Sequence, residues 1–206
     1  MSIASLVRTG PLLTASLLLS ACTGIGLGVQ PPNCPVEPVP TGELPDVELR
    51  AHMRFTIGSE EARFEAIARS TPQELRIVGI SVYGIRLFAI HQRGVEFRIE
   101  GAPSRAFEHL ALWTFDALHR SIWIETPMNA AAGPVVSWQR ENERMTESVE
   151  AGERHREFSR SRTSARVRVH YTTTAAPAKH FEIRNPWCGY EAVIAIAGSG
   201  GEPSGE

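Results

Sequence analysis

The sequence contains three cysteines, and their thiols are its best candidates for covalent chemistry. They are Cys22, Cys34 and Cys188. A cysteine thiolate can bind zinc, but zinc motifs bring their ligands together in close pairs, and these three residues are widely spaced. Two reactions of the thiol remain to be considered, which are acylation and oxidation to a disulfide. The residues around each cysteine indicate which of the two reactions to expect.

Cys22 ends a segment with the layout of a secretory signal peptide, in which one basic residue, Arg8, precedes an apolar run over residues 12–19. The run is shorter than the ~20 apolar residues that a transmembrane helix needs. The residues Leu19-Ser20-Ala21-Cys22 resemble the bacterial lipobox, in which the cysteine is lipidated and becomes the new N-terminus. We therefore expect residues 1–21 to be a lipoprotein signal peptide and Cys22 to carry a palmitate-type anchor. The alternative is an ordinary signal peptide with a chance cysteine.

Cys34 and Cys188 would then belong to an exported protein, and compartments outside the cytoplasm favour disulfides. We expect these two cysteines to be paired, with two free thiols as the alternative. A bond between them would close nearly the whole domain into one loop. In the chain-entropy model such a loop stabilises the fold by about 4–5 kcal/mol.

Acid, base and nucleophile patterns are weak. The seven histidines never form the HExxH arrangement that places two metal ligands on one helical face, and no Gly-x-Ser-x-Gly elbow exposes a serine. Asp116 and His119 are three residues apart on a predicted helix, but an acid/base pair needs a third partner, so an ordinary pair on the helix surface is expected. The sequence therefore predicts no catalytic residue, no metal ligand and no cofactor. The protein is expected not to be an enzyme, and a hydrolase has no motif in its favour.

The net charge of −2 is too close to neutral to suggest nucleic acid as a partner. Lys179 is the only lysine among 21 basic residues, so the cations are almost all arginines. Many of these arginines alternate with apolar residues along the chain. Solvated strand faces explain that alternation without a ligand.

These side chains must be positioned by one domain, which the sequence places between residues 47 and 198. Residues 22–46 carry the expected lipidated cysteine and are rich in proline and glycine, so we expect an extended tether. Residues 199–206 are of low complexity and predict a disordered tail. The domain shows period-two alternation of apolar and polar residues, which predicts eleven strands. They cover residues 47–57, 63–69, 74–84, 85–92, 95–101, 134–140, 143–151, 154–161, 165–173, 179–185 and 189–198.

One segment, residues 104–123, has helical spacing instead, and Ser104 can cap its start. Four of its apolar residues define the face that would turn toward the sheet. The sequence thus predicts a mainly β (α+β) fold, a curved antiparallel sheet or half-barrel of about ten or eleven strands with one inserted helix. The apolar face of the helix consists of Phe107, Leu110, Trp113 and Ile122.

A lipobox followed by a sheet with one inserted helix resembles the LolA/LolB group of envelope proteins. The run from Gly79 to Phe88, the segment "FEHLALWTFDAL" and the closing "IRNPWCGYEAVIAIAG" are similar to an uncharacterised family of small bacterial lipoproteins, often encoded beside aryl-polyene biosynthesis genes. The similarity covers about residues 74–197. That family usually shows a Trp-Pro pair near the helix, whereas Trp113 is followed here by Thr114.

The resemblance implies a half-barrel whose helix is a lid over an apolar cavity, with Phe107, Leu110, Trp113 and Ile122 on the inner face of the lid. It implies a non-enzymatic lipoprotein that binds or transfers lipid, polyene or lipoprotein acyl chains in the bacterial envelope. A packed core without a cavity is the alternative, and it would suit an adaptor lipoprotein that binds an envelope complex of unknown composition. Thr23 replaces the aspartate that retains lipoproteins in the inner membrane of enteric bacteria, which favours the outer membrane, facing the periplasm.

Overall fold

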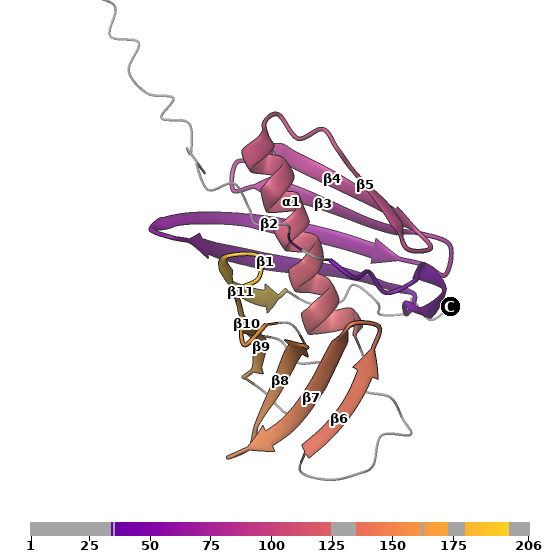
Figure 1. The fold of residues 1–206 in the computed structure, drawn as a ribbon. Helices are drawn as coiled ribbons and strands as arrows, with labels where there is room; N and C mark the ends of the chain where they lie inside the picture. Colours follow the sequence, from indigo (N-terminus) through magenta and orange to yellow (C-terminus); the bar gives the residue numbers. More distant parts are fainter. Residues whose placement is uncertain (1–33, 35, 125–134, 162, 173–179, 198–206) are drawn as a thin grey trace, which may run out of the picture.

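The computed structural model describes residues 34, 36–124, 135–161, 163–172 and 180–197. Within them, eleven strands form one antiparallel sheet, and one helix lies inside its curve (Figure 1). The predicted fold class is therefore confirmed. The strands are β1 (Val47–Ile57), β2 (Glu60–Ser70), β3 (Leu75–Ser81), β4 (Arg86–Arg93), β5 (Glu96–Glu100), β6 (Val135–Arg140), β7 (Glu143–Glu150), β8 (Glu153–Arg160), β9 (Arg166–Tyr171), β10 (His180–Asn185) and β11 (Tyr190–Ile196).

The order of the strands explains the position of the helix. The sheet runs β5-β4-β3-β2-β1-β11-β10-β9-β8-β7-β6, so the first and last strands of the chain are neighbours at its centre. Strands β5 and β6 lie at opposite edges, and the chain between them must cross from one edge to the other. The helix α1 (Arg105–Leu118) makes this crossing over the concave face and continues as one turn of π-helix, η2 (His119–Trp123).

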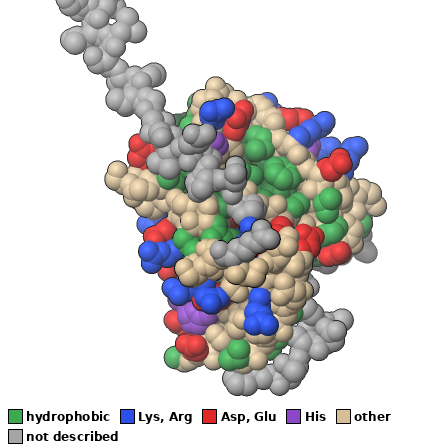
Figure 2. Space-filling view, in the orientation of Figure 1, with side chains coloured by type: hydrophobic (Ala, Val, Ile, Leu, Met, Phe, Trp, Pro, Cys, Tyr) green, Lys and Arg blue, Asp and Glu red, His purple; other side chains and the backbone are tan. Residues whose placement is uncertain are grey.

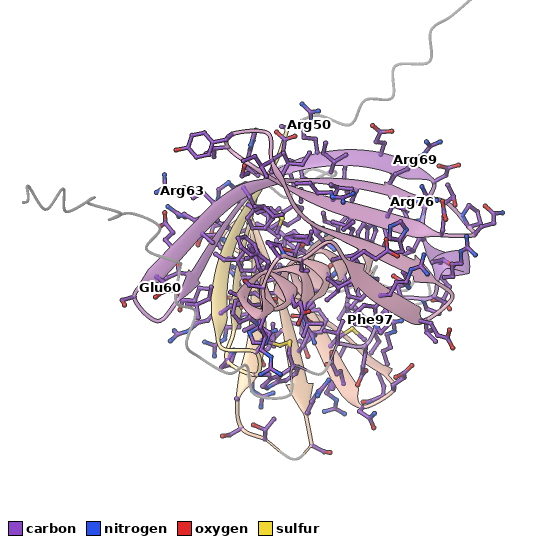
Figure 3. All side chains as sticks on the ribbon, turned by 90° about the horizontal axis from the view of Figure 1, so that it is seen from above. Arg50, Glu60, Arg63, Arg69, Arg76 and Phe97 are labelled. Carbon is purple, nitrogen blue, oxygen red and sulfur yellow. A yellow bond between two sulfur atoms is a disulfide. The ribbon has the colours of Figure 1, made fainter. Side chains whose placement is uncertain are left out.

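Alternation along each strand decides which side chains face the helix. In β1, Leu49, Ala51, Met53, Phe55 and Ile57 are buried, whereas the residues between them are polar and largely exposed. Successive side chains of a strand point to opposite faces, so the apolar set lines the inside of the curve. Figure 3 shows the complementary outer face, with arginines of β1, β2 and β3 pointing away from the helix.

Tight turns hold neighbouring strands in register. Gly58 and Gly94 adopt left-handed backbone conformations, with φ of 60° and 59°, in the turns that follow β1 and β4. Residues with a Cβ rarely adopt this conformation, which is why glycine stands there. Before β1, a short 3₁₀-helix, η1 (Thr41–Glu43), belongs to a segment that packs over the end of the helix.

Within the described ranges, no helix is both long and apolar enough to span a membrane. The predicted signal peptide and the predicted lipidation site, Cys22, lie outside the described residues, as does the tail over 199–206.

Candidate functional site

The concave face of β1 to β4 carries large apolar side chains. Phe55 and Phe64 have ring centroids 6.0 Å apart, and Phe64 meets Phe88 edge-on at 5.7 Å. Phe55 also contacts Tyr190 of β11 at 5.2 Å. These rings form one aromatic cluster on the concave face of the sheet.

Of the four residues predicted on the inner face of the helix, Trp113 reaches these rings, with its ring centroid 6.3 Å from that of Tyr190. Leu110 and Trp113 are buried, and Phe107 and Ile122 are partly buried against the same core. Helix and sheet thus share one apolar cluster, so the described interior is packed with side chains in this conformation. Phe115 of the helix is fully buried, and its ring centroid lies 4.4 Å from that of Phe97 on β5.

Some apolar side chains that pack against the core are only partly buried, and several of them lie on β4, β5 and α1; this region is called the seam below. The apolar side chains there are only partly buried, and Figure 2 shows hydrophobic side chains on the surface over this part of the molecule. Phe97 is labelled in Figure 3 beside the helix, on the inner side of the sheet. The residues of the seam are Phe97, Ile99 and Phe107.

The second half of the helix is held by buried charges. Arg120 donates two hydrogen bonds to the carboxylate of Glu143 on β7, at 2.8 and 3.0 Å, and a third to Asp116 at 2.9 Å. Asp116 also accepts hydrogen bonds from Asn185 at 2.6 Å and from the Tyr190 hydroxyl at 2.7 Å. All five residues are buried, and this set is called the buried polar network below.

The expectation of a surface pair at Asp116 and His119 is wrong, because both side chains are buried and they have different partners. The His119 ring accepts a hydrogen bond from the Val39 amide at Nδ1 (3.2 Å) and faces Gln92 Oε1 with Nε2 at 3.2 Å. This arrangement requires the neutral imidazole with its proton on Nε2. Burial first, and then the positive charges of Arg140 and Arg120, lower the pKa of His119 to about 3.

Electrostatics within the buried polar network favours its charged form. Burial alone would raise the pKa of Glu143, but hydrogen bonds and charge from Arg120 and then Arg160 outweigh burial and lower it. Burial would likewise lower the pKa of Arg120, whereas Asp116 and Glu143 raise it overall. Burial and the neighbouring Asp116 raise the pKa of Tyr190, so its hydroxyl stays protonated and donates.

Several arginines also depart from the expectation of solvated strand faces. Arg156 of β8 is buried and donates to Glu147 at 2.8 and 3.0 Å and to backbone carbonyls of η2 and of Ile124 that follows it. Arg120 lies over the ring of Phe158 at 4.6 Å, and Arg160 lies over Trp187 at 4.6 Å. Inward arginines are tolerated here because carboxylates, carbonyls and aromatic faces satisfy their donors and charge.

The predicted disulfide between Cys34 and Cys188 is present, with the two Cα atoms 4.7 Å apart. Next to it, Asn185 Oδ1 accepts hydrogen bonds from the backbone amides of Trp187 and Cys188, while its amide group donates to Asp116. The disulfide, the β10–β11 turn and the helix are therefore joined through one asparagine.

The β3–β4 turn has an apolar tip that the sequence analysis did not single out. Val82, Tyr83 and Ile85 are 73%, 87% and 63% exposed, and they belong to the run that carried the family resemblance. Ser81 and Gly84 shape the turn, and the Ser81 hydroxyl accepts from the amides of Tyr83 and Ile85. Such exposure of three large apolar side chains is typical of a contact surface.

An open antiparallel sheet curved around one helix, with an apolar concave face, defines a half-barrel protein. The chain belongs to the family described as "Protein of unknown function (DUF3261)", whose pattern matches residues 48–196. No curated protein is similar enough to match it. Among solved structures, it is similar to a DUF1329 family protein from Desulfovibrio piger, with 10% identity and a TM-score of 0.34 over 81% of this chain and 89% of that one.

Proposed function

We propose that this protein is a membrane-anchored envelope lipoprotein, without catalytic activity, whose half-barrel binds or transfers lipid or lipoprotein acyl chains. The seam between β4–β5 and α1 is the observation that carries the proposal. There the apolar core is only partly buried, at Phe97, Ile99 and Phe107. An acyl chain that replaced these contacts would gain about 0.8 kcal/mol for each methylene group it buried.

The two halves of the helix differ in a way that supports a hinged lid. The second half is tied to the sheet by the ion pairs of Arg120, and breaking such buried pairs is costly. The first half contacts the core through Phe107, Leu110 and Trp113, and Ser104 makes no side-chain capping bond. Lifting the first half would expose apolar surface, which a lipid chain could cover. The lid would therefore open at the seam and pivot near η2.

The exposed tip of the β3–β4 turn supports contact with a membrane. Val82, Tyr83 and Ile85 could enter the interface between headgroups and acyl chains without exposing new polar groups. Together with a lipid on Cys22, this tip would give the domain two points of attachment. We further propose that the protein is located in the outer membrane and that the lipid it carries is a polyene.

Probe binding by the full chain in detergent tests the proposal. Phe107→Asp places a charge in the seam, and we expect a folded protein that no longer binds an apolar fluorescent probe or long-chain lipid. Val149→Asp, at a position 53% exposed on β7, is the matched control and should keep probe binding. Circular dichroism reports folding for both variants.

The same measurements separate a carrier from an adaptor. Leu110→Asp should abolish binding without unfolding the domain if the helix can lift into water, because the new charge is then solvated. Global unfolding of Leu110→Asp, together with no probe binding by the unaltered chain at micromolar concentration, would refute the carrier. The packed interior would then support the adaptor lipoprotein.

A further inference from the structure

Two histidines meet on the outer face of the sheet, away from α1. His155 of β8 and His170 of β9 are direct partners in the strand register. Their rings are stacked, with centroids 4.7 Å apart and planes within 4° of parallel. Glu153, two residues before His155, lies on the same face, and its Oε2 is 3.0 Å from Nε2 of His170. One ligand atom from each of the three residues lies within 4.8 Å of the others.

The backbone holds this group in place. β8 is paired with β7 on one side and β9 on the other, and β9 is paired with β8 and β10. Glu153 and His155 share a face because side chains alternate along a strand, and the register brings His170 beside them. Both imidazoles are partly buried, so their rings are confined by neighbours, whereas the carboxylate of Glu153 is exposed and can adjust.

The surrounding charges favour a cation. Glu150 of β7 stands directly opposite Glu153, and like charges in this relation are unfavourable. Glu182 of β10 stands opposite His170, on its other side. The nearby cation Arg168 is engaged by Glu157 at 3.4 Å. A bound cation would relieve the repulsion between Glu150 and Glu153.

We infer that Glu153, His155 and His170 bind a first-row divalent metal ion, with Zn²⁺ as the representative. Imidazole nitrogens with a carboxylate oxygen suit Zn²⁺, Cu²⁺ and Ni²⁺, whereas Ca²⁺ and Mg²⁺ prefer sets of oxygen ligands. Zinc bonds of about 2.0–2.2 Å require ligand atoms roughly 3.3 Å apart, so metal binding would turn the two rings out of their parallel stack until one nitrogen of each points at the ion. Three protein ligands leave a fourth position for water or for a group of a partner.

The site would link β8 to β9 and is independent of the lipid proposal, because it lies on the face opposite the seam. No sequence motif reveals it, since His155 and His170 come from separate strands. His91 of β4 provides a natural comparison on the same outer face. It is partly buried and lies 3.4 Å from Glu100, but it has no second histidine as its register partner.

Calorimetric titration with Zn²⁺ alone, on the full chain purified without a polyhistidine tag at pH 7.5, tests the inference. We expect one ion per chain at micromolar affinity. His155→Asn and His170→Asn should each weaken binding at least about tenfold, and Glu153→Gln should weaken it less. His91→Asn should leave the affinity unchanged. Thermal melting provides a second measurement, because Zn²⁺ should raise the melting temperature of the unaltered chain and of His91→Asn but not of His170→Asn.

Three results would overturn the inference. The first is no heat of binding and no shift in melting temperature up to about 1 mM Zn²⁺. The second is an affinity of His155→Asn and His170→Asn equal to that of the unaltered chain. The third is an equal loss in His91→Asn, which would indicate nonspecific binding to surface histidines.

Discussion

Removing the charge of Asp116 should destabilise the whole domain, because its carboxylate is the centre of the buried polar network. In Asp116→Asn the side chain keeps its size but loses its charge, and its new amide group is a donor. The carboxylate now accepts bonds from Arg120, Asn185 and Tyr190, so the amide must face at least one of these donors. A charge-assisted hydrogen bond contributes about 1.5–3 kcal/mol, and a buried donor left without a partner costs about 1–3 kcal/mol.

These contributions lead to an expected loss of about 3–5 kcal/mol in the free energy of unfolding, the range for removing one partner of a buried ion pair. For a domain of this size the loss corresponds to a fall in melting temperature of roughly 6–20 °C. The measurement is urea unfolding at pH 7.5 with the disulfide intact, followed by circular dichroism.

Glu157→Gln is the matched control for this experiment. Glu157 also pairs with two arginines, Arg166 at 3.3 Å and Arg168 at 3.4 Å, but on the outer face, where ion pairs contribute about 0–1 kcal/mol. A loss below about 1 kcal/mol in Asp116→Asn, or equal losses in the two variants, would refute the view that burial makes this network important.

Three further predictions concern other parts of the chain. Burial of the neutral ring gives His119 a pKa of about 3 in the fold, against an ordinary value of 6.5. The neutral ring therefore favours folding above pH 6.5, and this contribution is lost as the pH falls toward 3. From pH 8 to pH 5 the chain should therefore lose about 2 kcal/mol more stability than His119→Gln, measured by urea unfolding; equal losses would contradict the buried neutral ring. Reduction of Cys34–Cys188, separated by 154 residues, should lower stability by about 5 kcal/mol, and an unchanged melting temperature would count against it. Cys22→Ala should abolish incorporation of labelled fatty acid, and label retained in the variant would exclude the lipobox.

The sequence was sufficient for the strands and for the apolar face of the helix. In β1 the alternation is unbroken over eleven residues, and burial of every second side chain follows from the geometry of a strand. Leu110 and Trp113 were identified for the same kind of reason, since helical spacing groups them on one face. The pairing of Cys34 with Cys188 was expected from the sequence with two free thiols as the alternative, and the structure decided for the disulfide.

Asp116 shows where sequence patterns were insufficient. Its partners Asn185 and Tyr190 lie 69 and 74 residues further along the chain, and no local period relates them. An aspartate three residues before a histidine suggests a surface pair, because isolated charges avoid burial. Only the crossing of α1 over the concave face brings enough donors to Asp116 to make its burial stable.

Local periodicity by itself determined which segments are strands, which is the helix and which faces are apolar, because these properties depend on neighbours within one or two turns or pleats. The tertiary structure decided which strand lies beside which, and with it the contact of Arg120 with Glu143 and the pairing of His155 with His170. The physical reason is that these contacts join residues distant in sequence. Their energies depend on register and burial, which exist only once the sheet has curved around the helix.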